Sequence, residues 1–386
     1  MTETGKLRIM VVYGGVSPEH DVAIVTALQI MNALKEAGFE VMPVYVSKEG
    51  NWYLGGESYL QPEMYKVTGN LVRKGKWVMW SADPDLGLLE KNWWGFGATV
   101  KQPDVVFPVI HGHGGEDGTL QGLLEMGRIP YVGCGVTTSA VKIDKYIAKK
   151  IAQACGLNVL KDILVIKGEK LTSAKKKEIK YPVMVKPVGL GSSIGLSRVN
   201  RQEDLDDALE VAFCYDQRVI IEEALDDFDE VNISVLGNNP YIVSVTEEPK
   251  SSGELLSFAD KYEGQGKIKG MAGSKRLIPA RQGTTVIREI EQGAEKYFRA
   301  IGGKGIARVD FMVDKKEKVY FNEINTMPGS LAYYLWDASG ITFPGLVKKL
   351  VDLAIEENGQ KDTLIRTFES NILAGFARNG LKGGKI

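Results

Sequence analysis

Two acidic residues and an amide near the C-terminal end of the sequence have the residue types and the spacing of a metal site. Residues 306–313 and 318–324 are short apolar runs separated by a lysine-rich turn, which predicts two neighbouring strands. In a hairpin of this length Asp310 can lie beside Glu323, and the alternation of side chains along a strand puts Glu323 and Asn325 on one face. Two carboxylates and an amide converging on one point form an all-oxygen site suited to Mg2+ that carries phosphates.

The alternative interpretation is a pair of solvated charges at the end of a hairpin, where such residues usually lie. Without a cation, the two carboxylates would repel one another and raise each other's pKa. The flanking residues favour a site. Arg308 alternates with Asp310, and the turn that follows Asn325 contains Gly329, which can bring a backbone N–H against a ligand.

Composition places the chain among ordinary globular enzymes. Of its 386 residues 44% are apolar and 25% charged, and the length allows two or three domains. A net charge of −1 gives no general attraction to nucleic acid or to an anionic membrane. Three widely spaced cysteines, Cys134, Cys155 and Cys214, favour a reducing compartment, and we expect all three to be buried free thiols. The first apolar run is too short for a signal sequence or a membrane span, so we expect a cytoplasmic protein.

The N-terminal elements predict an α/β fold. Leu7–Tyr13 has the continuous apolar character of a buried parallel strand and ends in two glycines. Ser17 is the candidate N-cap of a helix that Gly38 ends, and another apolar strand follows. In a strand–helix–strand unit, ligands bind at the carboxyl ends of the strands. Glu19 therefore lies at a ligand position, although a capping role would also explain it.

Two segments between residues 50 and 125 have different expected roles. Residues 50–100 hold most of the tryptophans and predict an inserted β-rich segment, in which packing is favoured over nucleic-acid stacking because basic residues form no stripe. The glycine-rich sequence HGHGGEDGTLQ then opens a helix and could present N–H groups to an anion. His111 and His113 have a spacing that could bind a metal, but no third ligand type clusters with them.

The central part of the chain predicts a phosphate site. The helix expected over residues 142–153 carries Lys145, which on its own would usually belong to a solvated face. A strand ends at Lys186, and a Gly/Ser loop over residues 189–195 leads into another strand rather than a helix, which excludes a P-loop. Such a loop can close over phosphates with its N–H groups and with the hydroxyls of Ser192 and Ser193.

Eight motifs in order resemble the D-alanine:D-alanine ligases of the ATP-grasp superfamily over nearly the whole chain. They are GGVSPEHDVA, HGHGGEDGTLQGLLE, PYVGCGVTTSAVKIDK, VMVKPVGLGSSIG, VIIEEAL, DKY at 260–262, ARVDF and NEINTMPGSL. The resemblance implies a three-domain ATP-grasp fold, α/β with α+β in the ATP-binding part. Its domains would be an N-terminal parallel-sheet domain (1–133, with the insertion 50–100), a central lid domain (134–228) and a C-terminal domain carrying the metal site (229–386).

The resemblance also implies a role for each matching residue. The ATP phosphates and the loop over them would be bound by Lys145, Lys186, Lys261, Ser192 and Ser193. The adenine edge and the ribose acceptor would be Glu222, Glu223, Leu225 and Glu230. The Mg2+ ligands would be Asp310, Glu323 and Asn325, and the oxyanion donors Arg308 and the Gly329 N–H. The amino-acid subsites would be formed by Glu19, Ser192, Tyr262, His111, Ser330 and Leu331.

The implied reaction is the ATP-dependent joining of two D-alanines through a D-alanyl phosphate, for peptidoglycan precursor synthesis. It implies two Mg2+ ions, with Mn2+ as a possible substitute, a lid over residues 251–273 and a homodimer, without nucleic-acid partners or membrane insertion. Two alternatives stay open: a related ligase with D-lactate or D-serine as acceptor, and a nucleotide-binding homologue without turnover. Tyr262 favours D-alanine as acceptor, whereas a shortened loop after Gly329 leaves the second subsite open.

Overall fold

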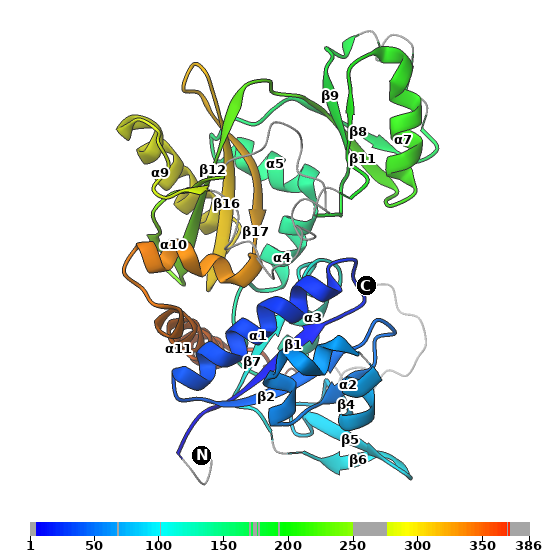
Figure 1. Cartoon of the computed structure of the whole chain (residues 1–386), viewed down its shortest axis with the longest axis vertical. Helices are drawn as coiled ribbons and strands as arrows, with labels where there is room; N and C mark the ends of the chain where they lie inside the picture. Colours follow the sequence, from blue (N-terminus) through cyan, green and yellow to red (C-terminus); the bar gives the residue numbers. More distant parts are fainter. Residues whose placement is uncertain are drawn as a thin grey trace.

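In the described part of the chain, three large β-sheets carry helices of their own, and a fourth sheet consists only of β14 (Glu248–Pro249) and β15 (Arg276–Leu277). The computed structural model describes residues 5–370 apart from residues 68, 101, 170, 173–175, 177, 192–193, 250–275 and 369. Figure 1 shows the first sheet at the bottom, the second at the upper right and the third at the upper left. No helix in these described ranges is both long enough and apolar enough to span a membrane.

The first sheet has seven strands and a parallel centre. In spatial order they are β6 (Gly95–Thr99), β5 (Leu88–Asn92), β4 (Lys76–Trp80), β3 (Trp52–Leu54), β2 (Glu40–Val46), β1 (Arg8–Gly14) and β7 (Val105–Val109). β1 runs parallel to β2 and β7, as predicted, and the segment 50–100 adds β3 to β6 as an antiparallel extension. Short helices accompany it: η1 (Glu57–Leu60), η2 (Pro62–Lys66) and α2 (Gly69–Lys74).

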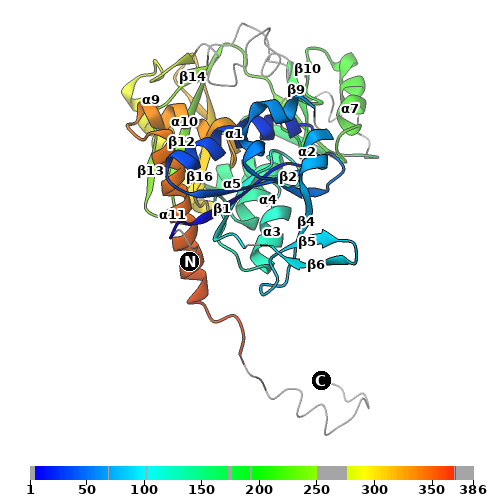
Figure 2. The same cartoon turned by 60° about the horizontal axis from the view of Figure 1, so that its bottom comes forward.

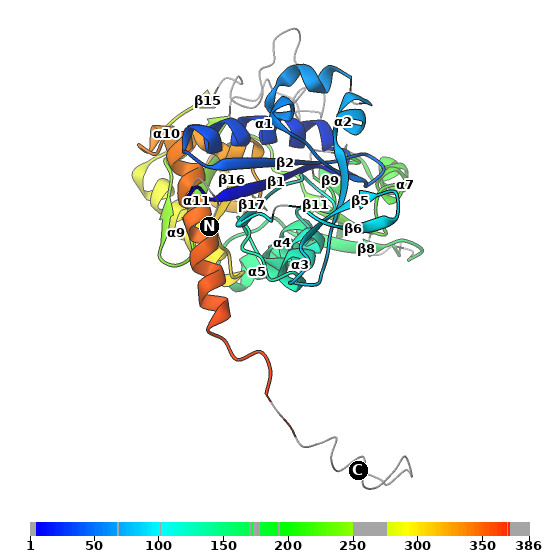
Figure 3. The same ribbon diagram turned by 90° about the horizontal axis from the view of Figure 1, so that it is seen from below.

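Helices cover both faces of the first sheet because successive side chains of β1 point to opposite sides. Ile9, Val11 and Tyr13 pack in one core with α1 (His20–Glu36) and α11 (Phe343–Asp362). Met10 and Val12 pack on the other face with α3 (Thr119–Met126). Figure 3 shows α1 above this sheet and α3 below it, and Figure 2 shows α11 extending away from the body.

The second sheet is antiparallel, with the strand order β10 (Ser197–Val199), β9 (Val183–Pro187), β11 (Arg218–Glu223) and β8 (Asp162–Ile166). The 3-10 turn η3 (Gln202–Asp204) and α7 (Leu205–Phe213) follow β10, and α7 packs on the sheet. The prediction that the Gly/Ser loop joins two antiparallel strands is confirmed by the pairing of β9 with β10.

The third sheet carries the predicted acidic hairpin. Its strand order is β13 (Tyr241–Val243), β12 (Phe228–Gly237), β16 (Ile306–Asp314) and β17 (Val319–Asn325). Its apolar face packs against α9 (Thr284–Ala300) and α5 (Lys145–Ala154). The remaining elements are α4 (Val136–Ile143), β14 (Glu248–Pro249), β15 (Arg276–Leu277), η5 (Gly329–Ala332) and α10 (Tyr333–Ala338).

Two predicted helix starts are wrong. α1 begins at His20 with Glu19 at the N-cap position. Ser17 belongs to a preceding turn, in which its hydroxyl oxygen accepts the Glu19 N–H and its carbonyl oxygen accepts the His20 N–H. The helix expected over residues 142–153 is two helices, because Asp144 leaves the helical conformation and accepts the Ile147 N–H as the N-cap of α5.

Two burial expectations also fail. Cys134 and Cys155 are buried, but Cys214 is exposed at the end of α7, in the turn that leads into β11. Trp80 packs in the core of the first sheet, whereas Trp93 and Trp94 are 94% and 92% exposed. These two residues form the turn between β5 and β6, beyond the reach of any core.

Candidate active site

The predicted acidic row lies on the polar face of the third sheet. Asp310 on β16 is directly opposite Glu323 on β17, and Arg308 is opposite Asn325. On the other side of β16, Asn232 of β12 is opposite Asp310. The structure therefore brings together the three side chains that the sequence assigned to a metal.

A β-bulge puts them there. Val319 and Phe321 face the apolar core, and strict alternation would send Glu323 and Asn325 to that same side. The register shifts between Asp310 and Phe311, so that Phe311 pairs with Phe321 and Asp310 with Glu323, leaving Asn322 as an extra residue. A bulge re-aims the side chains that follow it, which is why they are frequent beside active sites.

Asp310 is held tightly on this face. Arg308 donates from Nε to Oδ1 at 2.6 Å and from Nη2 to Oδ2 at 2.7 Å, and Asn325 Nδ2 donates to Oδ2 at 3.0 Å. Burial raises the pKa of Asp310 to about 6, and the negative charges of Glu323 and Glu230 add to this effect while Arg308 opposes it. Negative charge thus accumulates here beyond what one arginine neutralises.

This donor set fits a hard divalent cation. Two carboxylates and an amide supply oxygen ligands, and the repulsion between Asp310 and Glu323 is what a cation would relieve. Within the described residues, no group of three or more His, Cys, Asp or Glu side chains is arranged to hold a metal, so a histidine site at His111 and His113 has no support.

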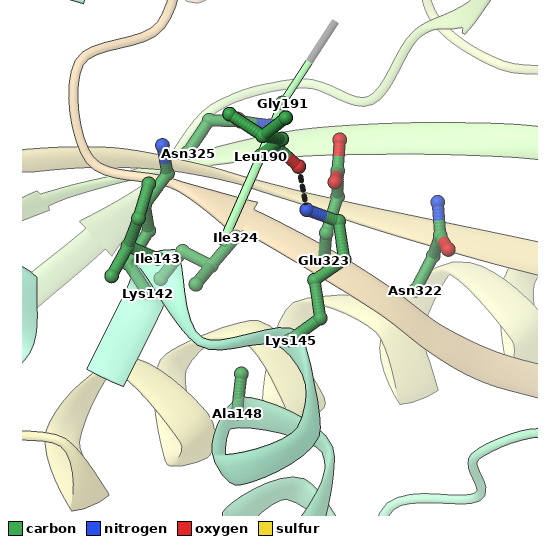
Figure 4. A pocket seen from close by; sticks show the side chains of 10 residues that line it. All are labelled: Lys142, Ile143, Lys145, Ala148, Leu190, Gly191, Asn322, Glu323, Ile324 and Asn325. Carbon is green, nitrogen blue, oxygen red and sulfur yellow. Dashed lines mark hydrogen bonds between the residues drawn. The ribbon is translucent and has the colours of Figure 1, made fainter. Parts of the chain in front are cut away.

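Lys145 faces this row across a pocket at the start of α5. The pocket is lined by Lys142, Lys145, Leu190, Gly191, Glu323 and Asn325, among others (Figure 4). Lys145 Nζ donates to the carbonyl oxygen of Leu190 in the Gly/Ser loop, which links that loop to α5. Burial lowers the pKa of Lys145 to about 8, although the nearby carboxylate of Glu323 opposes the shift. The ammonium group of Lys145 and the acidic row thus line the same pocket.

Lys186 is paired with the buried carboxylate of Glu222 on the neighbouring strand β11. Glu222 also pairs with Lys149 of α5, a helix lysine to which the sequence analysis gives no role. Burial raises the pKa of Glu222, but the two lysines outweigh it and lower the pKa to about 2. The carboxylate therefore stays charged and fixes Lys186 beside the pocket.

The other residues assigned to the nucleotide lie at the junction of the second and third sheets. Glu223 ends β11, and its N–H donates to the carbonyl oxygen of Lys161 at 2.9 Å, so this donor is not available to a purine. Leu225 follows in the connection to β12. Glu230 lies on β12, where its Oε1 accepts from Asn232 Nδ2 at 3.0 Å.

Glu19 lies where two glycine loops meet. A Cβ atom built on Gly112 would be 2.9 Å from Glu19 Oε2, and one built on Gly191 would be 3.6 Å from the same oxygen. The start of α1, the loop after β7 and the Gly/Ser loop thus converge on one carboxylate, as its expected role as a ligand residue requires.

Thr26 of α1 connects two of the remaining substrate candidates, His111 and Ser330. Its hydroxyl is 3.1 Å from Nε2 of the buried His111 and accepts the Ser330 N–H at 3.3 Å. Burial lowers the pKa of His111, which keeps the ring neutral. Leu331 is part of the core around α1, so only its backbone could contact a substrate.

The turn that contains Ser330 and Leu331 is strained. Ser330, Leu331 and Ala332 have φ angles of 54°, 56° and 47°, three successive left-handed residues without a glycine. Each such residue costs about 1–2 kcal/mol relative to ordinary backbone. Packing against α1 and the hydrogen bond from the Ser330 N–H to Thr26 hold the turn in place.

The glycine loop that opens α3 does not offer the predicted anion cradle. The Gly112 N–H donates to Glu116 at 2.9 Å, and the N–H groups of Gly114 and Thr119 donate to Asp117 at 2.8 and 3.0 Å. The carboxylates of Glu116 and Asp117 thus accept hydrogen bonds from the N–H groups that a phosphate would need.

Four assigned residues, Ser192, Ser193, Lys261 and Tyr262, lie outside the described residues, as does the expected lid. Sequence reasoning missed Thr26, Glu116, Lys142 and Lys149, which link segments far apart in the chain. A signal for the bulge was available, because the apolar positions 319 and 321 are followed by 324 rather than 323.

Comparison with known proteins agrees with this geometry. The family described as "D-ala D-ala ligase N-terminus" matches residues 8–134, and "D-ala D-ala ligase C-terminus" matches residues 151–352. The D-alanine–D-alanine ligase of Caldicellulosiruptor bescii is 41% identical over 382 residues, covering 93% of this chain and 98% of the relative. That of Geobacillus kaustophilus is 38% identical, covering 94% and 99%.

Solved structures give the same result. The D-alanine-D-alanine ligase from Coxiella burnetii superposes with a TM-score of 0.79 at 29% identity, covering 94% of this chain and 97% of that one. The VanG D-Ala:D-Ser ligase from Enterococcus faecalis superposes with a TM-score of 0.76 at 30% identity, covering 90% and 99%. Two antiparallel sheets with lysines and an acidic row between them, beside a parallel-sheet unit, define an ATP-grasp enzyme. Within that class, the chain belongs to the D-alanine–D-alanine ligase family.

Proposed function

We propose that this protein joins two D-alanine molecules to D-alanyl-D-alanine, with conversion of ATP to ADP and phosphate, as a step in peptidoglycan precursor synthesis. The observation that carries the proposal is the pocket in which Lys145 faces Glu323 and Asn325 while Glu19 lies at the adjoining loops. In this proposal Lys145 would bind a phosphate, Glu323 and Asn325 would bind a metal, and Glu19 would bind an ammonium group, which their proximity supports.

Asp310, Glu323 and Asn325 are the residues that would hold magnesium, as two ions that manganese could replace. When bound, the metal would neutralise charge on the transferring phosphoryl group. Lys145 and Lys186 would bind ATP phosphates. Lys186 has three N–H donors, so it could bind a phosphate while one of them stays on Glu222, which Lys149 also holds.

The first step is attack by the carboxylate of one D-alanine on the γ-phosphorus of ATP, which breaks the bond to ADP. Both partners are anions, so the reaction depends on cations that hold them in line. Glu19 would bind the ammonium group of this D-alanine through a charge-assisted hydrogen bond. The product is an acyl phosphate with a good leaving group.

In the second step the neutral amine of the other D-alanine attacks the acyl carbon, and phosphate leaves from the tetrahedral adduct. Arg308 uses two of its donors on Asp310 and retains others for the oxyanion, together with the Gly329 N–H. Ser330, Leu331 and His111 would border the acceptor. Ser192, Tyr262 and Lys261 keep the roles that the family resemblance implies.

Three further features belong to the proposal. The domains would be residues 1–133, 134–228 and 229–386, which is supported by the confinement of the first two sheets to the first two ranges. We also propose that the protein is a cytoplasmic homodimer. Light scattering after size-exclusion chromatography would test the dimer by measuring the mass of the particle.

The deciding assay mixes purified protein, ATP, Mg2+ and D-alanine and measures phosphate release together with dipeptide by mass spectrometry. D-lactate and D-serine are then supplied as competing acceptors, because one structural relative is a D-Ala:D-Ser ligase. A dominant D-alanyl-D-alanine product supports the proposal. A dominant ester or D-alanyl-D-serine product would replace it, and no phosphate release under saturating Mg-ATP would favour a binding protein without turnover.

A further inference from the structure

An ion pair at the edge of the pocket has no part in the reaction described above. Lys142, in the last turn of α4, places Nζ 2.9 Å from Oε1 of Glu116, and the two side chains are only 9% and 5% exposed. Lys142 also lines the pocket with Lys145 and Glu323 (Figure 4). The burial of Lys142 needs an explanation, because a lysine side chain is rarely buried unless it is paired with an opposite charge.

Glu116 connects its own loop to two other segments of the chain. Its Oε2 accepts the Gly112 N–H at 2.9 Å, and its Oε1 accepts the Met327 N–H at 3.2 Å in addition to the Lys142 ammonium. The pair therefore ties the loop after β7 and the turn after β17 to the end of α4.

Each tied segment borders a different substrate group. Gly112 lies against the carboxylate of Glu19, which would bind the ammonium of the first amino acid. Met327 comes two residues before Gly329, whose N–H would bind the oxyanion. The separation between these two groups thus depends on Glu116 holding both backbones.

We propose that the Lys142–Glu116 ion pair is a positioning latch that fixes the Glu19 side of the amino-acid site relative to the Gly329 turn. The proposal rests on the proposed ligase function. Lys142 and Glu116 act through the segments they hold and need not contact a reacting atom.

Electrostatics explains why the latch needs both charges. Burial alone would raise the pKa of Glu116, but the positive charge of Lys142 and the hydrogen bond from the Gly112 N–H lower it below its ordinary value. Burial likewise opposes the charge of Lys142, but Glu116 raises its pKa, with smaller contributions from Glu19 and Glu323. Without Lys142, a second buried carboxylate would lie near Glu19 and would compete for the substrate ammonium.

The kinetic test compares Lys142→Met, Lys142→Arg and the matched surface control Lys348→Met, which breaks an exposed Lys–Asp pair on α11. We expect Lys142→Met to lower kcat/KM for D-alanine by about 10²-fold, the usual effect of a small misplacement, with the KM for ATP changed by less than about twofold. Lys142→Arg restores most of the loss, and Lys348→Met changes neither constant.

Adding Glu116→Gln to Lys142→Met should cost little more than the worse single change, because both remove the same latch. Hydrogen exchange at residues 108–118 and 325–332 should be faster in Lys142→Met than in the wild type or Lys348→Met. This readout decides on the latch even if the wild-type protein makes no dipeptide, a result that would sink only the proposed function. The latch would be overturned if hydrogen exchange were unchanged in both segments, or if the loss of kcat/KM in the double variant were the product of the two single losses. An equal loss of kcat/KM for ATP and for D-alanine would also overturn it.

Discussion

Replacing Lys149 by methionine should destabilise the protein and weaken ATP binding together. Lys149 Nζ donates to the Leu160 carbonyl oxygen at 2.8 Å, lies 2.9 Å from Asp162 Oδ2 and pairs with Glu222. The side chains of the three charged residues are at most 5% exposed. Methionine keeps much of the side-chain volume but leaves two buried carboxylates with less compensation.

The size of the effect follows from the protonation of Glu222. Its pKa falls from the ordinary 4.5 to about 2 in the folded protein. A carboxyl group with such a shift contributes roughly 3 kcal/mol at neutral pH. Breaking a buried ion pair by removing one partner costs about 3–5 kcal/mol in other proteins. Because Lys186 remains beside Glu222, we expect a loss of about 2–3 kcal/mol.

The assay is urea unfolding at pH 7, with Lys150→Met as the matched control. Lys150 is the next residue of the same helix and pairs with Asp162 at 2.8 Å, but its side chain is 40% exposed, so its loss should cost less than about 1 kcal/mol. The KM for ATP should rise in Lys149→Met only, since Glu222 and Lys186 lose their anchor. A Lys149→Met protein as stable as the control, with an unchanged KM, would refute the reasoning.

The same carboxyl group predicts a pH dependence. A depressed pKa contributes stability that is present above about 4.5 and is lost as the pH falls toward 2. The stability difference between the wild type and Glu222→Gln should therefore be constant from pH 7 to pH 5.5 and shrink below about 4.5. A gap that widens on acidification would contradict this assignment of the charge.

Three other predictions concern the pocket. Glu323→Gln should lower turnover at least about 10²-fold in a phosphate-release assay while leaving the melting temperature nearly unchanged, and near-normal turnover would argue against a metal at this row. Since the pKa of Lys145 is about 8, kcat/KM for ATP should fall as the pH rises past that value, and a flat profile up to pH 9.5 would exclude a role for its charge. Asn322 is the extra residue of the bulge, so its deletion should restore strict alternation and leave Glu323 and Asn325 on the polar face. A variant that loses more than about nine tenths of wild-type activity would refute this assignment of the bulge.

Local signals in the sequence sufficed for the elements that depend on neighbouring residues. The antiparallel pairing of β16 with β17 was predictable because a short lysine-rich turn joins two apolar runs, but Asp310 lies opposite Glu323 rather than Asn322 only because of the bulge. The parallel strands β1 and β2 were predictable from the glycine turn and the helix between them. The bulge was not predicted, since the interpretation assumed unbroken alternation along β17.

Contacts between distant segments could not be derived in this way. Nothing near Lys149 in the sequence distinguishes it from an exposed helix lysine, and its burial depends on Glu222, 73 residues away. The glycine loop before α3 had every local feature of an anion site, but Glu116 and Asp117 satisfy its N–H groups. A local pattern identifies donors without showing whether the chain itself already uses them.

The most direct test of the account follows an oxygen atom. If the pocket activates D-alanine by phosphorylating its carboxylate, one carboxylate oxygen must leave with the phosphate when the amine attacks. D-alanine labelled with 18O in both carboxylate oxygens, incubated with the protein and Mg-ATP, should yield phosphate carrying one 18O for each dipeptide formed. Dipeptide accompanied by unlabelled phosphate would contradict the account.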